Sequence, residues 1–272
     1  MIGRQWRLTW RKAGPVLSVV LLVALVVVPI GLLLWLIFYT DIFNIQAITV
    51  VDARKETTDE IRVMVEQELM AHPSRSLFFV EPGVIENKIL TKFTYVRSVQ
   101  ARRQLPGTLR VVIQEKDPAL LLLVNNRYYF VDSEGLAYEE ARLDTLPGLI
   151  LPTVKDRNPD SQVILGTPVL SESFVRFVQT VEGELPNKIE AEVVEVLIPS
   201  LAAREVQFQL DNNWKIRFDV TRSAEGQLTL LQELVNSTIS VEERAALDYV
   251  DLRIPKRIYY KTRFNDSPQT AE

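Results

Sequence analysis

The sequence of 272 residues contains no cysteine and a single histidine, His72. Disulfides, cysteine-ligated zinc, iron–sulfur clusters, thiol nucleophiles and any site that needs two histidines are therefore excluded. His72 precedes Pro73 at the end of a predicted helix, where a cation interacts favourably with the helix dipole. We interpret His72 as a helix-terminus residue and not as a catalytic base, and we predict no bound metal or cofactor.

Glycine is also scarce, with 10 residues, and the motifs of common enzyme classes are missing. The sequence has no Gly-x-Ser-x-Gly, Ser-x-x-Lys, glycine-rich phosphate loop or His-Glu-x-x-His. The adjacent acids Glu139-Glu140 and Glu242-Glu243 are of the type that glycosidases use, but adjacent side chains seldom converge on one substrate. We interpret them as surface or helix-start residues. The sequence therefore predicts a protein that is not an enzyme, with an extracytoplasmic cell-wall enzyme as the alternative.

The chain has no overall excess of basic residues, since 31 Lys and Arg stand against 35 Asp and Glu for a net charge of -4. No basic field exists to gather nucleic acid phosphates, so we predict no nucleic acid partner. Arg97, Arg102 and Arg103 lie close together, but the chain after the apolar segment is acidic as a whole and aromatic residues do not alternate with these arginines. These arginines therefore predict a solvated strand face near anionic lipid or cell wall.

A long apolar segment follows a basic N-terminus. Residues 13–40 carry no formal charge, and residues 16–39 read VLSVVLLVALVVVPIGLLLWLIFY. At about 1.5 Å per residue this segment spans roughly 36 Å, which exceeds the roughly 30 Å hydrocarbon core of a bilayer. A cleaved signal peptide has a shorter apolar part and a small-residue cleavage site. We therefore predict an uncleaved transmembrane helix at 16–39, through which the protein contacts the lipid bilayer.

The charges that flank the apolar segment predict its orientation. Residues 1–15 form a basic tail without acids, and acids follow the segment from Asp41 onward. By the positive-inside rule, the tail is cytoplasmic and residues 41–272 are extracytoplasmic.

Residues 43–116 have the pattern of a small mixed domain. The sequence Thr57-x-x-Glu60 is a capping box, and Ile85, Ile89 and Phe93 recur at helical spacing on one face. Two helices on one face of a three-stranded sheet would bury such stripes. The predicted elements, in β-α-α-β-β order, are a strand at 43–51, a helix from Thr57, a helix from Glu81-Pro82, and strands at 96–104 and 109–115.

Residues 117–264 are dominated by hairpin patterns with turns at Asn125-Asn126 and Asp211-Asn212-Asn213. An amphipathic helix entered from Ser171 or Ser173 and a second helix at about 224–236 are expected to pack on this sheet. Predicted strands lie at 119–124, 127–131, 136–138, 191–198, 205–210, 214–220, 249–254 and 257–264, and the stretch 146–168, punctuated by Pro and Gly, carries no predicted element.

The predicted fold class is α+β: a single transmembrane helix, then a small β-α-α-β-β domain, then a mainly antiparallel β domain with packed helices. The polar residues 265–272 are too few and too hydrophilic to fold alone, so we predict a disordered tail.

The segment 252–263 ends the predicted sheet, and its many positive side chains are typical of an edge strand. Lys and Pro often protect exposed edges against unwanted pairing, a role that Pro255, Lys256 and Lys261 would serve. Alternatively, a partner adds a strand to the edge through main-chain hydrogen bonds, and flanking Arg and Lys select an acidic, membrane-tethered partner. The pattern alone leaves both interpretations open.

Three stretches of the sequence are specific enough to support a family resemblance. They are the hairpin at 95–111 with Leu105-Pro106-Gly107-Thr108-Leu109, the turn Val131-Asp132-Ser133-Glu134-Gly135, and the strand Tyr249-Val250-Asp251-Leu252-Arg253. Together with the basic tail, the single anchor and the β-α-α-β-β order, these stretches make the chain resemble the FtsQ/DivIB family of bacterial cell-division proteins. The resemblance implies that residues 43–116 form a POTRA (polypeptide-transport-associated) domain.

The resemblance further implies a non-catalytic divisome scaffold in the plasma (inner) membrane at the division septum. Such a scaffold binds FtsB/DivIC-like and FtsL-like coiled-coil partners, contacts other divisome components and is linked to septal peptidoglycan synthesis. Carried over by position, Arg253 would pair with an acid of the FtsB-like partner, and Ile254 would lie at the same interface. The remaining implied partner-binding residues are Ile258, Tyr259, Tyr260 and Lys261.

A POTRA-bearing secretion component is the other alternative. Such a protein is expected to have repeated POTRA units and a C-terminal barrel of long alternating strands, and the sequence shows neither pattern.

Overall fold

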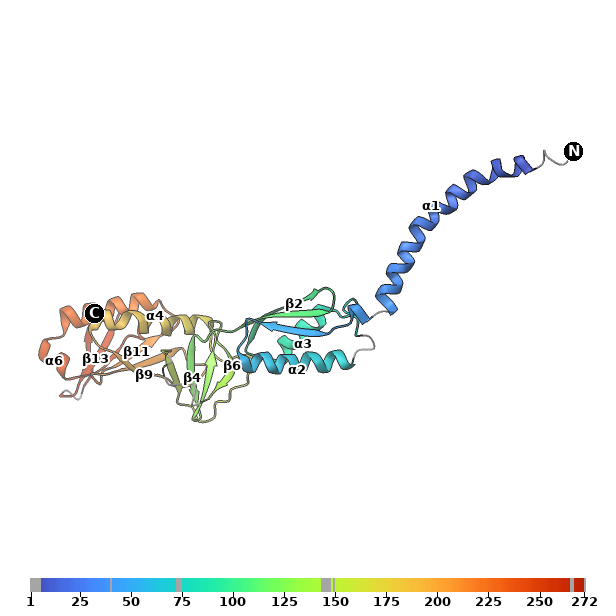
Figure 1. The fold of residues 1–272 in the computed structure, drawn as a ribbon. Coiled ribbons are helices and arrows are strands. Elements are labelled where there is room, and N and C mark those ends of the chain that lie inside the picture. The colour runs from blue at the N-terminus through green and yellow to red at the C-terminus, as the bar shows by residue number, and fades with distance from the viewer. Residues whose placement is uncertain are drawn as a thin grey trace. The chain divides into compact units, whose positions relative to one another are not determined.

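A computed structural model describes residues 6–271, except 40, 72–74, 143–147, 149 and 265–266 (Figure 1). The predicted helix-terminus residue His72 lies outside the described residues. The chain folds as two compact units, the first comprising residues up to 92 together with 98–114, and the second comprising 93–97 and the residues from 115 onward. The mixture of helices and strands in both units confirms the α+β class.

Helix α1 runs from Trp6 to Tyr39, so it includes much of the basic segment as well as the apolar one. Its part Ser18–Leu36 has a mean hydropathy of 3.1, and it is the one stretch among the described helices that is long and apolar enough to cross a membrane. The described side chains of this part are almost all exposed, as a helix that faces lipid requires. Helix α1 therefore has the properties of a single-pass membrane anchor.

The predicted β-α-α-β-β order of the first unit is confirmed. Its three-stranded sheet has the order β1-β3-β2, with β1 parallel to β3, and α2 packs against β1. Ile85, Ile89 and Phe93 are buried, as their spacing predicted. After a short turn, η1 (Asp41–Phe43), the elements are β1 (Ala47–Val51), α2 (Lys55–Ala71), α3 (Pro82–Lys92), β2 (Val96–Gln104) and β3 (Thr108–Glu115).

The predicted capping box at Thr57 is wrong, because α2 begins two residues earlier, at Lys55. The backbone turns at Asp52, where φ is 63°, and Thr58 N already donates to the carbonyl of Arg54 at 2.9 Å. Thr57 therefore lies inside the first turn, and its side chain is buried. Tertiary burial has overridden the local capping preference.

The second unit contains one sheet with the strand order β14-β13-β12-β11-β10-β9-β7-β4-β5-β6-β8. Most neighbouring strands are antiparallel, and the exceptions are the parallel pairs β4–β7, β7–β9 and β11–β12. The strands are β4 (Leu120–Val124), β5 (Arg127–Val131), β6 (Leu136–Ala141), β7 (Thr153–Asp156), β8 (Thr167–Pro168), β9 (Val193–Ile198), β10 (Glu205–Leu210), β11 (Lys215–Asp219), β12 (Leu247–Asp251), β13 (Ile258–Thr262) and β14 (Gln269–Ala271).

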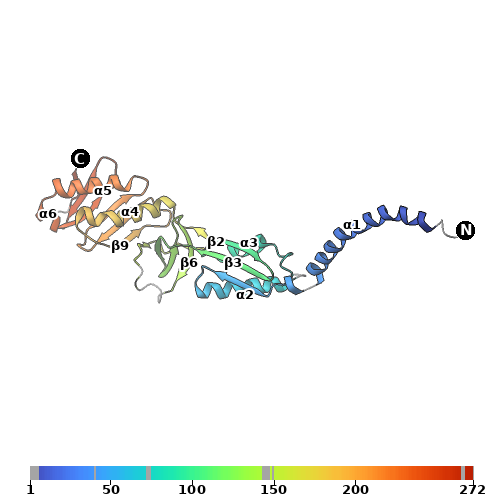
Figure 2. The same cartoon turned by 45° about the horizontal axis from the view of Figure 1, so that its top comes forward.

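Helices α4 (Glu172–Ile189) and α5 (Ala224–Glu233) lie side by side and pack on this sheet (Figure 2). The Ser171 side chain accepts a hydrogen bond from Phe174 N, which confirms the predicted start of α4. Helix α5 continues into a single π turn, η2 (Leu234–Thr238), and a short helix, α6 (Val241–Ala245), follows.

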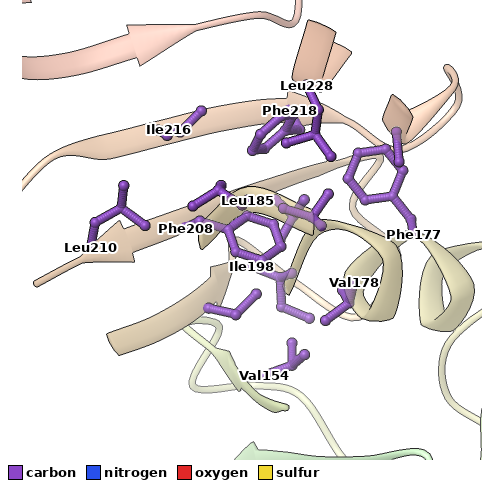
Figure 3. Packing of buried hydrophobic residues seen from close by; sticks show 14 of the residues in the cluster. Val154, Phe177, Val178, Leu185, Ile198, Phe208, Leu210, Ile216, Phe218 and Leu228 are labelled. Carbon is purple, nitrogen blue, oxygen red and sulfur yellow. The ribbon is translucent and has the colours of Figure 1, made fainter. Parts of the chain in front are cut away.

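The core lies between these helices and one face of the sheet (Figure 3). Phe177 of α4 and Phe208 of β10 both contact the ring of Phe218 edge to face, with centroids 5.8 and 5.5 Å apart. Such contacts add to the burial of large apolar surfaces. On β10 and β11, buried apolar side chains alternate with half-exposed polar ones, so along these two strands the other face of the sheet is polar and accessible.

Several elements occur where none was predicted. Strands β7 and β8 lie within 146–168, where β7 is held between β4 and β9 by backbone pairing. Helix α6 begins at a capping box made by Ser240 and Glu243, so the helix-start interpretation of Glu242-Glu243 is confirmed.

The prediction of a disordered tail at 265–272 is wrong for Gln269–Ala271, which form β14. This strand pairs with β13 through the backbone, which requires no apolar run in the sequence. Ala271 also packs against the core of the second unit.

Candidate interaction surface at the C-terminal end of the sheet

The register between β12 and β13 divides the predicted partner-binding residues between two faces of the sheet. Tyr259 lies opposite Asp251 and Lys261 lies opposite Tyr249, and opposed residues of antiparallel strands share a face. Tyr259 and Lys261 therefore lie on the polar face.

Two other predicted residues, Ile258 and Tyr260, point to the core face. Ile258 packs against the core, and Tyr260 belongs to it with a side chain that is 7% exposed. Burial, together with the charge of Glu243, raises the pKa of the Tyr260 hydroxyl. Ile258 and Tyr260 therefore fasten β13 to the domain, while their neighbours face solvent.

Arg253 lies just after β12 and is held by two carboxylates. Its Nε donates to Asp251 Oδ1 at 2.9 Å, and its Nη2 donates to Asp251 Oδ2 at 2.5 Å, which makes a bidentate pair. Its Nη1 donates to Glu205 on β10. The side chain is 33% exposed, so the guanidinium remains within reach of an outside group.

The electrostatics of this cluster favour the ionised forms of both Asp251 and Arg253. Burial opposes ionisation of Asp251, but the hydrogen bonds from Arg253 and the charges of Arg253 and Arg217 outweigh it and lower the pKa of that carboxyl. The hydrogen bond to Asp251 is the main reason that the pKa of Arg253 is raised, although burial acts against it. The cluster thus presents fixed charges at neutral pH.

Other polar groups extend the cluster across the same face. Arg217 donates from Nε to Gln207 Oε1 at 3.3 Å, and its guanidinium lies 5.0 Å above the ring of Tyr249. A shallow hollow of about 190 Å³ lies beside Arg253 and is lined by Arg157, Leu197, Ile198, Pro199, Glu205, Val206, Gln207, Arg217 and Arg253.

Sequence reasoning missed Glu205 and Arg217 as members of this site. Glu205 is 48 residues from Arg253 in the sequence and meets it only through the sheet. The alternation of polar residues Glu205, Gln207 and Gln209 with apolar ones along β10 was the available signal, since it marks a solvent-facing side.

The sequence predicts that β13 is the exposed edge strand of the sheet, whereas the strand at this edge is β14. Strand β14 pairs with Ile258, Tyr259 and Tyr260, so β13 is the second strand from the edge and that prediction is wrong. Ile254 lies outside the strands in the turn between β12 and β13, where Lys256 has a φ of 61°, and its side chain is 47% exposed.

These features define a class of protein: a single apolar anchor helix, a β-α-α-β-β unit and a larger sheet domain with a polar face. Residues 43–116 match the family model described as "POTRA domain, FtsQ-type". Relatives include "Cell division protein FtsQ" of Streptomyces bingchenggensis (strain BCW-1), 22% identical over 167 residues, which are 61% of this chain and 59% of that protein.

Proteins of the same name from Rickettsia typhi (strain ATCC VR-144 / Wilmington) and Rickettsia prowazekii (strain Madrid E) are 28% and 27% identical over 81 residues, 30% of this chain and 29% of theirs. The alignments thus span 59% or less of the length of these relatives. Residues 43–116 thus form an FtsQ-type POTRA domain, and the domain match and the names of the relatives both support the resemblance to the FtsQ/DivIB family.

Proposed function

We propose that the protein is a non-catalytic scaffold of bacterial cell division that binds FtsB/DivIC-like and FtsL-like partners at the C-terminal end of its sheet. Its FtsQ-type POTRA domain and the names of its relatives support a role in cell division. Its anchor helix supports a location in the plasma (inner) membrane, and we propose that it acts at the septum with residues 41–272 outside the cytoplasm. Through its partners it is linked to septal peptidoglycan synthesis.

The proposed binding mode rests on one observation: β14, a strand of three residues, pairs with only part of the edge of β13 that faces away from β12. A partner segment that pairs along all of β13 makes more main-chain hydrogen bonds than β14 does. Strand addition draws affinity from such bonds and specificity from alternate side chains. The partner strand therefore replaces β14.

Side chains of the polar face select the partner in this proposal. Tyr259 and Lys261 lie on that face, and Arg253 lies beside them. A partner carboxylate takes the place of Glu205 on Arg253 Nη1, while Asp251 keeps its bidentate contact and holds the guanidinium in position. Ile254, exposed in the turn, adds an apolar contact.

The experiment that tests this proposal is a titration of the full chain, reconstituted in nanodiscs, with the extracytoplasmic parts of FtsB-like and FtsL-like proteins. We expect saturable binding that is lost when residues 257–272 are removed. Circular dichroism and thermal melting of the truncated chain establish that the remaining domain is folded. Full affinity of a folded truncated chain, or no binding by the intact one, contradicts the proposal.

A further inference from the structure

Four apolar side chains are exposed at one end of the first unit: Ile42, Phe78, Phe79 and Leu105, which we call the proximal patch. Their exposed fractions are 48%, 39%, 43% and 61%. Ile42 lies in η1, the two phenylalanines lie in the segment before α3, and Leu105 lies in the turn between β2 and β3. An exposed cluster of large apolar side chains marks an interaction site more often than a solvated surface.

Backbone hydrogen bonds bring these distant segments together. Leu77 N donates to the carbonyl of Phe43 at 2.8 Å, and Gln46 N donates to the carbonyl of Gly107 at 2.8 Å. The rings of Phe43 and Phe78 meet edge to face, with centroids 5.0 Å apart. These contacts therefore hold the three segments that carry the proximal patch next to one another.

The covalent chain places the patch close to the membrane that α1 would cross. The apolar part of α1 ends at Leu36 and the helix ends at Tyr39, three residues before Ile42. At about 3.8 Å between consecutive Cα atoms, Ile42 lies within roughly 11 Å of the end of the helix. The headgroup region adds about 5–8 Å on each side of the hydrocarbon core, so Ile42 lies in it or just beyond it.

We propose that the proximal patch rests in the headgroup layer of the bilayer, so that the first unit docks on the lipid surface as well as being tethered to it. Phe and Leu side chains of interfacial segments bury at the boundary between headgroups and acyl chains. Arg75 and Arg102 are exposed in the same segments and provide cations for anionic headgroups. The inference rests on α1 spanning the bilayer and is independent of partner binding at the second unit.

The test uses the absence of cysteine, since each single-cysteine variant then carries one fluorescent label. Full chains with Leu105→Cys, Leu90→Cys or Leu25→Cys are reconstituted in vesicles of phosphatidylcholine and phosphatidylglycerol. Quenching by a lipid with a nitroxide near the headgroup is then measured. Leu90, 41% exposed, is the surface control because it lies near the end of α3 that leads to the start of β2, away from the β2–β3 turn.

We expect the label at position 105 to be quenched several-fold more than the label at position 90. The label at position 25 tests the anchor, because it must be shielded from a water-soluble quencher. Equal quenching at positions 105 and 90, with position 25 shielded, overturns the patch proposal while leaving the anchor and the proposed function intact. An unshielded label at position 25 overturns the patch proposal together with the anchor.

A second variant tests whether the apolar side chains themselves hold the unit on the lipid. Phe79→Ser should at least halve the quenching at position 105, whereas Val63→Ser, at a residue 51% exposed on α2, should leave it unchanged. Undiminished quenching in Phe79→Ser overturns the proposal. Protection of position 105 that requires an added division protein overturns it as well and assigns the patch to a protein partner.

Discussion

Arg253 shows how a single residue can be both structural and available for recognition. Asp251 holds two nitrogens of its guanidinium, and Glu205 holds the third. An internal partner for the third nitrogen means that an outside carboxylate must compete with Glu205. The net gain from such an exchange is smaller than that of pairing with an unoccupied arginine.

We predict that Arg253→Gln weakens partner binding about tenfold, or about 1.4 kcal/mol, because the partner carboxylate loses its charged donor. The difference should shrink as salt is added, since the guanidinium is partly exposed. Arg176→Gln is the matched control, because Arg176 is 70% exposed and pairs with Glu172 at the start of α4. Titration at two ionic strengths measures the effect, and unchanged affinity removes Arg253 from the interface.

Substitution of Glu205, the acid that competes with the partner carboxylate, should have the opposite effect on partner affinity. Glu205→Gln removes the charge that opposes the partner, so affinity should rise. Weaker binding in Glu205→Gln shows instead that Glu205 serves only to hold Arg253 in position.

Glu182 on α4 provides a prediction about stability and pH. Burial raises the pKa of this carboxyl from its usual value of 4.5 to about 7. Because the pKa of this carboxyl is higher in the folded state than in the unfolded state, folding favours its neutral form. The free energy of unfolding is therefore highest near pH 4 and falls as the pH rises toward 7. Because the carboxyl is only partly buried and solvent screens part of the effect, Glu182→Gln should stabilise the second unit at pH 8 by about 2 kcal/mol more than at pH 4.

The measurement is urea unfolding at both pH values, followed through the fluorescence of Trp214, which is buried in the second unit. Glu184→Gln, on the same helix and 44% exposed, is the control and should keep the original pH dependence. If Glu182→Gln changes the free energy of unfolding equally at pH 4 and pH 8, the pH dependence of stability does not come from Glu182.

Among the elements, the turn Val131-Asp132-Ser133-Glu134-Gly135 explains one of the stretches that carried the family resemblance. Asp132 Oδ1 accepts hydrogen bonds from Glu134 N and Leu136 N, and Lys116 Nζ lies 2.7 Å from Asp132 Oδ2. Gly135 has a φ of 83°, and a Cβ atom there would lie 2.1 Å from the carbonyl oxygen of Leu170. The structure therefore gives this motif a role in folding.

We predict that Gly135→Ala destabilises the second unit by more than about 2 kcal/mol, through the clash and the positive φ together. Gly183→Ala in α4 is the matched control, because no atom lies within 4 Å of its added Cβ, and it should stabilise by about 0.5–1 kcal/mol. Urea midpoints measure both effects. Equal stability of the two alanine variants contradicts the structural role of the turn.

Strand β14 provides a prediction about the affinity for the partner. If β14 occupies the position of the partner strand, removal of residues 265–272 raises the fraction of chains that are competent to bind, and the apparent dissociation constant falls. Calorimetric titration of the full and shortened chains measures this change. A weaker complex after removal shows that the partner adds to β14 itself.

The elements that could be predicted from the sequence are those with strong local patterns. The spacing of Ile85 and Ile89 and the alternation along 109–115 reflect burial on one face, and the structure confirms both. Strands β7 and β14 could not be predicted, because backbone pairing with distant strands defines them. The pairing of Arg253 with Glu205 could not be predicted from the sequence either, because strand pairing brings these distant residues together.

At the scale of the whole molecule, the proposed function joins an anchor helix to a sheet whose polar face we propose lies outside the cytoplasm. The charge asymmetry of the sequence predicts that orientation, since the first 15 residues are basic and acidic residues outnumber basic ones over the rest. An anchored scaffold meets partners that are anchored in the same bilayer at a high effective concentration. Under these conditions the proposed strand addition requires only moderate affinity.

The most direct test of strand addition is crosslinking in dividing cells that produce the full chain with one cysteine. Lys261→Cys places the cysteine on the polar face of β13, and Arg176→Cys places it on α4. Strand addition predicts a disulfide adduct between position 261 and a cysteine placed at the one residue of an FtsB-like partner that lies opposite it, much weaker adducts two residues to either side, none at the residues between them, which point to the other face, and none at position 176. Adducts at both positions, or at neither while division proceeds normally, would contradict partner binding by strand addition at β13.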